Sequence, residues 1–345
     1  MSVTKFGHLP VIKGDILSIT HRRDFDGVSS AAQLICKYGG AVKRVLFSNY
    51  DEETFHATIE TIKGMNLKDT NIIVSDLSAQ DGRVEAVTAL FKSLKADGNR
   101  IIWLDHHPWS DYALRRISKS VDFIIAGENS DYCASELVFR VLCSDNAVCK
   151  ALSEFAHITD FNLKAHIKRD ESALKKISEV ITYLDTESKK SNLSMLRLAR
   201  EVSAGELNGP ECKKVHKEYK IDERKNLKAI KATVASISGS KYIIGVAFST
   251  NMESNLACTK ISELTGSKIQ VFVTTKDGSA HVRSFSGIDC SRLSRALGGN
   301  GHPQASGFQV NPAKFSNFSS AGRKRYVEMV REAATRAYKT KFTYI

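Results

Sequence analysis

A histidine and two aspartates lie close together in the segment HRRDFDG, where His21, Asp24 and Asp26 fall within six residues. The apolar run before them, Ile16 to Thr20, is typical of a buried strand, so the three side chains follow a strand end. A turn there can direct all three towards one divalent cation. However, Asp26 followed by Gly27 is also typical of a plain turn, and His21 could be a satisfied histidine at a strand end.

Two further apolar runs end in residues that can bind metal. Asp76 follows the run in IIVSDLS, and Asp105, His106 and His107 follow the run in IIWLDHHPW. Three such strand ends in one sheet predict that these polar side chains lie together at one edge of the sheet. Two divalent ions about 3.5 to 4 Å apart at that edge can activate a water molecule and stabilise an in-line displacement. A carboxylate must then bridge both ions, and Asp76 is the candidate. Mixed carboxylate and imidazole donors suit manganese better than calcium.

The elements that must position these residues follow a βαβ rhythm. In the N-terminal half, short β-branched or apolar runs are followed by polar turns and helical stretches. The runs are Ile16 to Thr20, Val42 to Phe47, Ile72 to Val74, Ile101 to Leu104 and Phe123 to Ile125. Because they do not alternate with polar residues, we predict an α/β fold with a doubly wound, mostly parallel sheet buried on both faces. Ligands of such sheets bind beyond the carboxyl ends of the strands.

The segment from about Lys189 to Val234 is polar and favours helix, although Gly209 and Pro210 interrupt it. We interpret it as a connector between domains. Its basic residues lie at positions 213, 214, 217, 220, 224, 225, 228 and 231. They form either a solvated helix face or a guide for a phosphate backbone, and the sequence allows both.

Strand-like runs resume after the connector, at Tyr242 to Phe248 and at Ile269 to Thr275. The tripeptide KDG after the second run predicts a hairpin, and a helix is expected from Gly322 to Lys339. We therefore expect a second, smaller α/β domain across a cleft from the first. The expected division is 1–190 for the catalytic metal-binding domain, 191–235 for the basic helical connector and 236–345 for the substrate-binding domain.

The order of the motifs resembles that of the DHH phosphoesterase family. HxxDxDG is followed by a lone Asp after an apolar strand, then DHH, a late Asp in HITD and finally GGxGHPxAxGF, so the match runs from Ile16 to Phe308. DHH alone is a weak signal, whereas five elements in this order are highly specific. The resemblance implies a metal-dependent phosphodiesterase, RecJ-like or NrnA-like, with a DHH-associated C-terminal domain.

The resemblance also implies a ligand set for two divalent ions, Mn²⁺ first and Mg²⁺ as the alternative. One ion would be held by His21, Asp24 and Asp76, and the other by Asp26, Asp76, His106 and Asp160. Asp160 could instead be simply a helix end.

Four residues would carry the chemistry of this centre: Asp76, Asp105, His106 and His107. Asp105 and His107 would sit just outside the ligand set. Asp105 would orient a ligand imidazole through its ring N–H, and His107 would face the substrate phosphate.

In the second domain the resemblance implies a substrate clamp. Its glycine-rich loop, in which backbone N–H groups approach a phosphate closely, would consist of Gly298, Gly299, Gly301 and His302. Arg283 in HVRSF would grip a phosphate with its planar fork of donors. Asn300 departs from the commoner all-glycine loop. Without the DHH context, a Gly-rich turn needs no ligand and Arg283 is simply an exposed strand residue.

Four other residues near the motifs are interpreted as structural. Glu136 in ASELV is expected to support the site from a helix, and Tyr132, Trp103 and Trp109 are expected to pack, with base stacking as a further option for Trp109.

Three functions fit these features. The first is a two-metal nuclease, an exonuclease or oligoribonuclease, on single-stranded or very short DNA or RNA. The second is a phosphatase or phosphodiesterase of small nucleotides such as 3′-phosphoadenosine 5′-phosphate or a cyclic dinucleotide. The third is an inactive replication scaffold, which the intact set of ligands disfavours. The short HxxDxDG spacing resembles archaeal RecJ-like proteins, some of which partner the replication factor GINS.

Composition sets outer limits on these choices. The 345 residues exceed what one core usually organises, and the net charge of +12 favours a polyanionic partner. The first residues contain no long apolar run, and no stretch reaches the length of a membrane span, so we expect a soluble, cytoplasmic protein without a membrane partner. The seven scattered cysteines contain no CxxC pair and are expected to be reduced and mostly buried.

Overall fold

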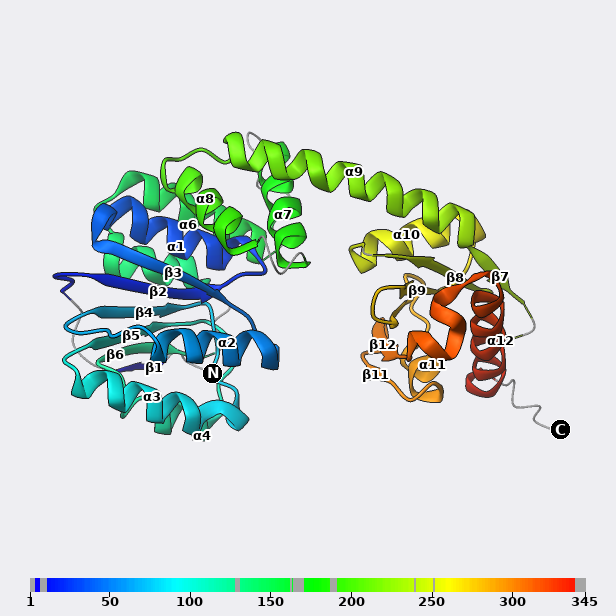
Figure 1. The fold of residues 1–345 in the computed structure, drawn as a ribbon, viewed down its shortest axis with the longest axis horizontal. Helices are drawn as coiled ribbons and strands as arrows, with labels where there is room; N and C mark the ends of the chain where they lie inside the picture. Colours follow the sequence, from blue (N-terminus) through cyan, green and yellow to red (C-terminus); the bar gives the residue numbers. More distant parts are fainter. Residues whose placement is uncertain are drawn as a thin grey trace. The chain divides into compact units, whose positions relative to one another are not determined.

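The computed structural model describes residues 4–6, 11–127, 131–161, 163, 171–186, 191–238, 240–250 and 252–338. The chain divides into two units, Met1–Tyr219 and Lys220–Ile345. Within the described residues, each unit is built on a sheet of six strands (Figure 1). The predicted α/β class is confirmed.

The sheet of the first unit has the order β1-β6-β5-β4-β2-β3. Its strands are β1 (Thr4–Phe6), β2 (Ile16–His21), β3 (Val42–Ser48), β4 (Asn71–Ser75), β5 (Arg100–Leu104) and β6 (Phe123–Ala126). β2 to β6 are parallel, and all five predicted runs form strands. The short edge strand β1, antiparallel to β6, was not predicted because three residues carry no readable pattern.

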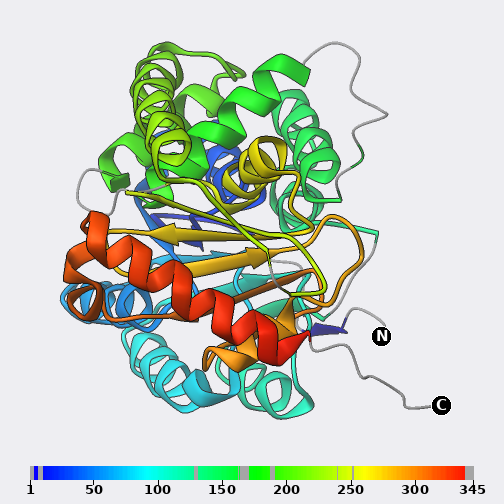
Figure 2. The ribbon, with the colours of Figure 1, turned by 90° about the vertical axis from the view of Figure 1, so that its right-hand side faces the viewer.

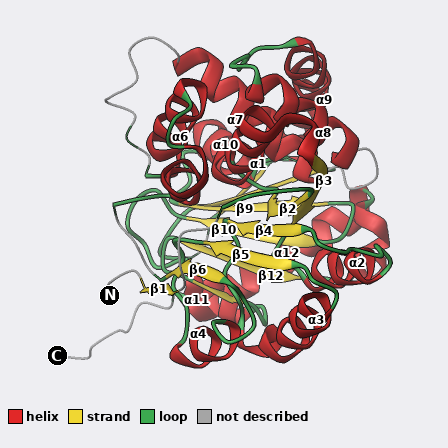
Figure 3. Cartoon of the chain, turned by 90° about the vertical axis from the view of Figure 1, so that its left-hand side faces the viewer, coloured by secondary structure: helices red, strands yellow, loops and turns green. Residues whose placement is uncertain are grey.

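Helices cover both faces of this sheet, which confirms the doubly wound prediction (Figure 3). They are α1 (Phe25–Tyr38), α2 (Glu52–Lys63), α3 (Val84–Ala96), α4 (Asp111–Ile117), α5 (Ala134–Val138), α6 (Ala147–Asp160), α7 (Glu171–Thr186) and α8 (Ser191–Ser203), with a π-helical turn at Phe139–Cys143. Ile16 and Leu17 are adjacent in β2 and both are buried, but they belong to two different core clusters. Burial on both faces explains why the strands read as continuous apolar runs.

The strand order changes direction at one place in this sheet. β2 pairs with β3 on one side and with β4 on the other, so the chain leaves β2 in one direction and later returns on its other side. In doubly wound sheets the ligand site lies at such a switch point, outside the carboxyl ends of the strands. His21 ends β2 and Asp76 directly follows β4.

The predicted connector is largely part of the first unit. In α8, Met195 and Leu198 are buried in the same cluster as Val28 of α1. The helix that follows, α9 (Pro210–Thr233), contains the division between the two units and carries the basic residues from Lys213 to Lys231. The three-part division of the chain made from the sequence stays a prediction.

The second unit has the sheet order β11-β12-β10-β9-β8-β7. Its strands are β7 (Ala235–Ile237), β8 (Ile244–Ser249), β9 (Ile269–Thr274), β10 (Ser279–Arg283), β11 (Asn300–Gly301) and β12 (Ala305–Gln309). Its helices are α10 (Ser254–Thr265), α11 (Ser291–Ala296) and α12 (Ser320–Ala337). α12 lies along one face of the sheet (Figure 2), where Tyr326 packs with Val246 and Val271, and α10 covers Ala247 and Phe272.

The hairpin and the C-terminal helix predicted for this unit are both present. β9 and β10 pair antiparallel, and the Asp277 carboxylate accepts a hydrogen bond from the Ser279 backbone N–H at 2.9 Å. Gly278 has a φ of +80°, which glycine adopts without strain. A turn of this kind fixes the register of the hairpin.

The remaining global expectations concern cysteines and membranes. All seven cysteines are unpaired, and six of them are buried. Among the described residues, no helix combines the length and the apolar character that crossing a membrane requires.

Candidate metal centre

The turn after β2 holds the first part of the site. His21 is buried at the strand end, and its Nδ1 lies 3.1 Å from Oδ2 of Asp24 and 3.6 Å from Oδ2 of Asp76. Asp24 caps α1 by accepting a hydrogen bond from the Gly27 backbone N–H at 3.1 Å. Gly27 is required here because a Cβ would stand 2.1 Å from the carbonyl oxygen of His21. HRRDFDG is therefore a turn whose His21 and Asp24 lie where they could bind a metal ion together with Asp76.

The charges of His21 and Asp24 in this turn depend on each other. Burial opposes ionisation of Asp24, but the hydrogen bond with His21 outweighs it and holds the pKa of Asp24 near 2. Burial also opposes the charged form of His21, yet its hydrogen bond with Asp24 and the nearby charge of Asp76 raise its pKa to about 11. The positive charge beside the two carboxylates is thus the proton of His21, which a metal ion bound by His21, Asp24 and Asp76 would replace.

Asp26 is held by a helix that lies far away in sequence. Its two carboxylate oxygens accept hydrogen bonds from the backbone N–H groups of Ala134 at 2.8 Å and Ser135 at 2.7 Å, at the start of α5. Burial and the nearby Asp76 raise the pKa of Asp26 well above its usual range. The helix end fixes the direction of the carboxylate, and its second lone pairs stay available to a ligand.

Asp76 adopts an uncommon backbone conformation, with a φ of +57°. Its backbone N–H donates to the carbonyl oxygen of Leu104 at 3.1 Å, and its side chain is 1% exposed. Burial and the charge of Asp24 raise the pKa of Asp76 to about 8. In the described part of the chain, Oδ2 of this buried carboxylate has no hydrogen-bond partner. A strained residue with an unsatisfied buried oxygen indicates a functional position.

His106 brings the remaining donors together. Its Nε2 lies 3.6 Å from Oδ2 of Asp26, 3.6 Å from Oδ1 of Asp76 and 3.8 Å from Oδ2 of Asp160. This Nε2 is buried and finds no hydrogen-bond partner among the described residues. Asp160 is indeed a helix end, the last residue of α6, and that position also points it at the cluster.

The donors form three overlapping groups, within each of which the ligand atoms lie within 4.8 Å of one another. The groups are His21, Asp24 and Asp76; Asp26, His106 and Asp160; and Asp76, His106 and His107. The first equals the set expected for one ion. The second contains three of the four donors expected for the other ion and lacks Asp76. Asp76 belongs to the first and the third group, and its Oδ1 lies 3.6 Å from Nε2 of His106, the histidine that the second and third groups share. The third group was not expected, because it adds His107.

Asp105 contacts a different imidazole from the one expected. Its Oδ1 lies 2.8 Å from Nδ1 of His107, and its Oδ2 accepts a hydrogen bond from Nε1 of Trp109 at 2.6 Å. We expected Asp105 to orient an imidazole of the ligand set, whereas it orients His107. Burial lowers and Asp105 raises the pKa of His107, with a net rise to about 9. Trp109 packs edge-on against Trp103, as expected, and also holds Asp105 in place.

Two residues at the site were missed by sequence reasoning. Asn49 and Tyr50 directly follow β3, and Oδ1 of Asn49 lies 3.3 Å from Nε2 of His21. The Tyr50 hydroxyl lies 3.5 Å from Nδ1 of His107, and its ring centroid is 5.0 Å from that of His21. The available signal was their position at the carboxyl end of a strand next to β2, although neither residue is an acid or a histidine.

The residues interpreted as structural behave as expected. Glu136 accepts a hydrogen bond from the Cys133 backbone N–H at 3.0 Å and so caps α5. Tyr132 packs under Arg140, whose guanidinium carbon lies 4.2 Å from the ring centroid.

In the second unit, Arg283 ends β10 and is tied to the start of α10. Its Nε donates to Oδ1 of Asn255 at 3.0 Å, and one terminal nitrogen donates to Oγ of Ser254 at 3.0 Å. These bonds orient the guanidinium. Arg283 pairs with Ala305 of β12, so it lies near the segment that follows the glycines.

The glycines before Ala305, Gly298, Gly299 and Gly301, are required by the fold of the second unit itself. A Cβ on Gly299 would stand 2.0 Å from the carbonyl oxygen of Gly307, and one on Gly301 would stand 2.5 Å from Cα of Ser306. Gly298 has a φ of +82°. These positions therefore need glycine whether or not a phosphate binds, and the exposed His302 follows them.

Comparisons with known proteins give structural likeness without sequence relatives. No family model matches the sequence, and no curated protein matches it. A pGpG-specific phosphodiesterase, PggH, from Vibrio cholerae is 13% identical with a TM-score of 0.49, covering 92% of this chain and 99% of that one. An exopolyphosphatase-related protein from Bacteroides fragilis is 14% identical with a TM-score of 0.41, covering 92% and 93%.

RecJ in complex with Mg²⁺ from Thermus thermophilus is 14% identical with a TM-score of 0.47, covering 91% of this chain and 50% of RecJ. Likenesses at this level do not establish an activity, so the activity is inferred from the side chains of the site.

Proposed function

We propose that this protein is a two-metal phosphodiesterase that hydrolyses single-stranded or very short nucleic acid. The observation that carries the proposal is the position of Asp76, which shares two donor groups and keeps a buried oxygen without a hydrogen-bond partner among the described residues. A buried carboxylate in this state is costly unless a cation pairs with it. Two ions, one on each side of Asp76, satisfy this need.

The side chains of the three donor groups fit such a pair of ions. His21, Asp24 and Asp76 would hold one, and Asp26, Asp76, His106 and Asp160 the other, with imidazole donors favouring Mn²⁺ over Ca²⁺. When bound, two such ions supply a hydroxide nucleophile at neutral pH and stabilise the charge of an in-line displacement. Because all six donors assemble, an inactive scaffold is disfavoured.

The side chains around this centre would bind and align the substrate. Asp105 fixes Nδ1 of His107, which leaves Nε2 of that imidazole to donate to a phosphate oxygen. Arg283 of the second unit, oriented by Ser254 and Asn255, would bind the part of the substrate that is not cleaved. The net charge of +12 and the basic residues of α9 favour a polyanion.

The test is hydrolysis by metal-stripped protein to which Mn²⁺ or Mg²⁺ is returned. DNA and RNA labelled at the 5′ or the 3′ end, from dinucleotides to about thirty-mers, would show polarity, sugar preference and length preference. We expect cleavage that needs the metal and is lost in Asp76→Asn. A metal-loaded wild type that cleaves none of these, yet dephosphorylates 3′-phosphoadenosine 5′-phosphate, would instead support the small-nucleotide alternative. Hydrolysis without added metal would overturn the two-metal proposal.

A further inference from the structure

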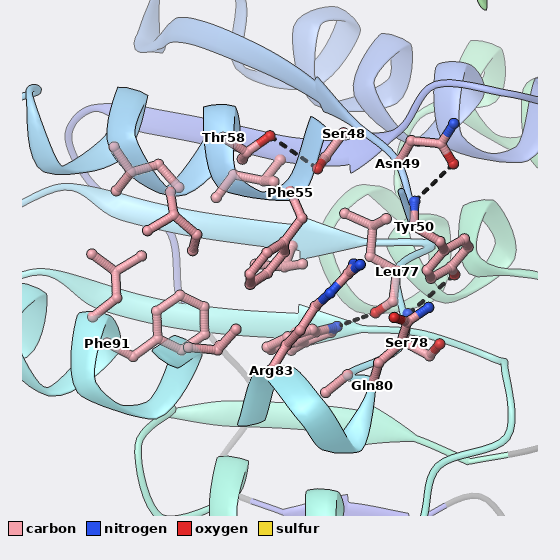
Figure 4. Close-up of a pocket in the computed structure, with 18 residues that line it drawn as sticks. Ser48, Asn49, Tyr50, Phe55, Thr58, Leu77, Ser78, Gln80, Arg83 and Phe91 are labelled. Atoms are coloured by element: carbon pink, nitrogen blue, oxygen red, sulfur yellow. Dashed lines mark hydrogen bonds between the residues drawn. The ribbon is translucent and has the colours of Figure 1, made fainter. Parts of the chain in front are cut away.

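A pocket lies between α2, α3 and the first sheet, at the carboxyl ends of β3 and β4 (Figure 4). Its cavity volume is about 70 Å³. The walls are mainly apolar and include Phe55, Ile59, Val74, Val87, Phe91 and Trp103. These walls belong to the core cluster between the sheet and the two helices, so they are rigidly packed.

Polar groups gather at one side of this pocket. Figure 4 shows Asn49, Tyr50, Ser78, Gln80 and Arg83 there. The Ser78 backbone N–H donates to the Tyr50 hydroxyl at 3.2 Å. An apolar cavity with a few convergent polar groups is the usual form of a site for a small organic group.

The cation on this side is Arg83. Its guanidinium carbon lies 4.5 Å above the Phe55 ring, and one terminal nitrogen donates to Glu52 at 3.1 Å. A guanidinium placed over an aromatic ring is a planar cation on which a second planar group can stack. It also presents N–H donors at its edge.

The pocket is joined to the metal centre through two of its own lining residues. Asn49 contacts Nε2 of His21 at 3.3 Å, and Tyr50 contacts both His21 and His107. A group in the pocket would therefore contact the same two side chains that contact the histidines of the donor groups. The base and the phosphate of one nucleotide are likewise neighbours, joined by a single sugar.

We propose that this pocket receives the base of the nucleotide whose phosphate lies at the metal centre, with a preference for pyrimidines. The inference rests on the proposed phosphodiesterase function and names the group that this part of the site recognises. The cavity has room for roughly five water molecules, close to the displaced volume of one six-membered ring and short of a purine. The apolar walls cover the ring, while Gln80, Arg83 and Asn49 meet its carbonyl and amino groups.

The first test fills the pocket. Ala79→Leu adds three carbons to a lining residue that is 9% exposed, and Ala89→Leu makes the same change on the exposed side of α3. Hydrolysis of dinucleotides with a pyrimidine or a purine at each position gives the ratio of kcat/KM. We expect a wild-type preference for pyrimidine of about tenfold at one position, lost in Ala79→Leu and kept in Ala89→Leu.

A second variant guards against misfolding. Gln80 is exposed, so Gln80→Ala leaves the walls intact and should reduce the discrimination between cytosine and uracil without removing the preference for a single ring. Binding of cytidine monophosphate, followed by quenching of tryptophan fluorescence since Trp103 lines the pocket, gives a readout without hydrolysis.

The outcomes separate the two proposals. A wild type that cleaves no phosphodiester defeats the proposed function, whatever the variants do. The base pocket is overturned, while the phosphodiesterase proposal stands, if the wild type cleaves dinucleotides but two results follow. The ratio of kcat/KM for pyrimidine over purine is the same in wild type and in Ala79→Leu, and cytidine monophosphate does not quench the tryptophan fluorescence.

Discussion

Oε2 of Glu136 lies 2.7 Å from Nδ1 of His157, and it also accepts the backbone N–H of Cys133. This carboxylate links α5 to α6. The start of α5 holds both oxygens of Asp26, and α6 ends at Asp160, one turn after His157. The positions of Asp26 and Asp160, two donors of the second group, therefore depend on the contact between Glu136 and His157.

Glu136→Gln should weaken the second metal site and spare the first. Glutamine keeps the capping bond to Cys133 but loses the charge that His157 meets, so Asp26 and Asp160 lose their fixed spacing. Direct hydrogen-bond partners of metal ligands contribute roughly 10- to 100-fold to metal affinity, and because Glu136 acts one contact further away we expect a loss of about 10-fold or less. Calorimetric titration with Mn²⁺ should show one weakened and one unchanged site. Glu154→Gln, an exposed residue of α6, is the matched control, and an equal loss at both sites would contradict the link.

Asp76→Asn should abolish hydrolysis without destabilising the metal-free protein. Asparagine tolerates the left-handed conformation at φ +57°, and it removes a carboxylate that burial and Asp24 keep from ionising. We expect kcat below about a hundredth of wild type, because metal-generated hydroxide is the only nucleophile proposed. The melting temperature of the metal-free variant should equal or exceed that of wild type. Asp76→Ala should lower the free energy of unfolding by about 1 to 2 kcal/mol more than Asp76→Asn does, because alanine adopts the left-handed backbone conformation less readily.

The stabilisation that Mn²⁺ gives should grow from pH 6 to pH 8. Without metal, the pKa of Asp76 is raised from 3.8 to about 8, so its contribution to stability is present below pH 4 and lost towards pH 8. The raised pKa values of His21, about 11, and His107, about 9, act in the same direction above pH 6.5. Metal binding needs the deprotonated ligands and so strengthens with pH.

Melting curves with Mn²⁺ and with a chelator, recorded at each pH, measure this difference. A shift in melting temperature that is constant across the range would show that these groups do not titrate with metal binding.

Much of the site follows from sequence because its determinants are local. His21 and Asp24 lie on one turn, and strand ends in a parallel sheet meet at one edge, so Asp76 and His106 could be placed beside them. The support of the site is not local. Asp26 is held by residues 108 and 109 positions away, and no pattern near Asp26 announces that contact.

Side-chain direction was the other gap. The sequence placed Asp105 beside two histidines but could not tell which of them it would bond, and it bonds His107. Asn49 and Tyr50 were missed because amide and phenol side chains after a strand are common in turns. The pocket beside them depends on how α2 and α3 pack, which no short motif encodes.

Arg283→Ala should weaken substrate binding and leave metal binding intact, because Arg283 lies in the second unit and none of the donor groups found among the described residues contains it. Its guanidinium is already oriented by Ser254 and Asn255, so little order is lost on gripping a phosphate. A charge-assisted hydrogen bond of about 1.5 to 3 kcal/mol predicts a loss in kcat/KM of roughly 10- to 100-fold on a dinucleotide.

The control for this clamp is a substrate that does not need it. Bis(p-nitrophenyl) phosphate can reach the metal centre without a second nucleotide, so Arg283→Ala and His302→Ala should hydrolyse it at nearly the wild-type rate. Asn255→Ala, which removes one bond that orients Arg283, should give a smaller loss on the dinucleotide than Arg283→Ala does. Equal losses on the dinucleotide and on the small diester would place Arg283 at the reacting phosphate itself. The second unit would then take part in the chemistry, and its assignment as a substrate clamp would have to be abandoned.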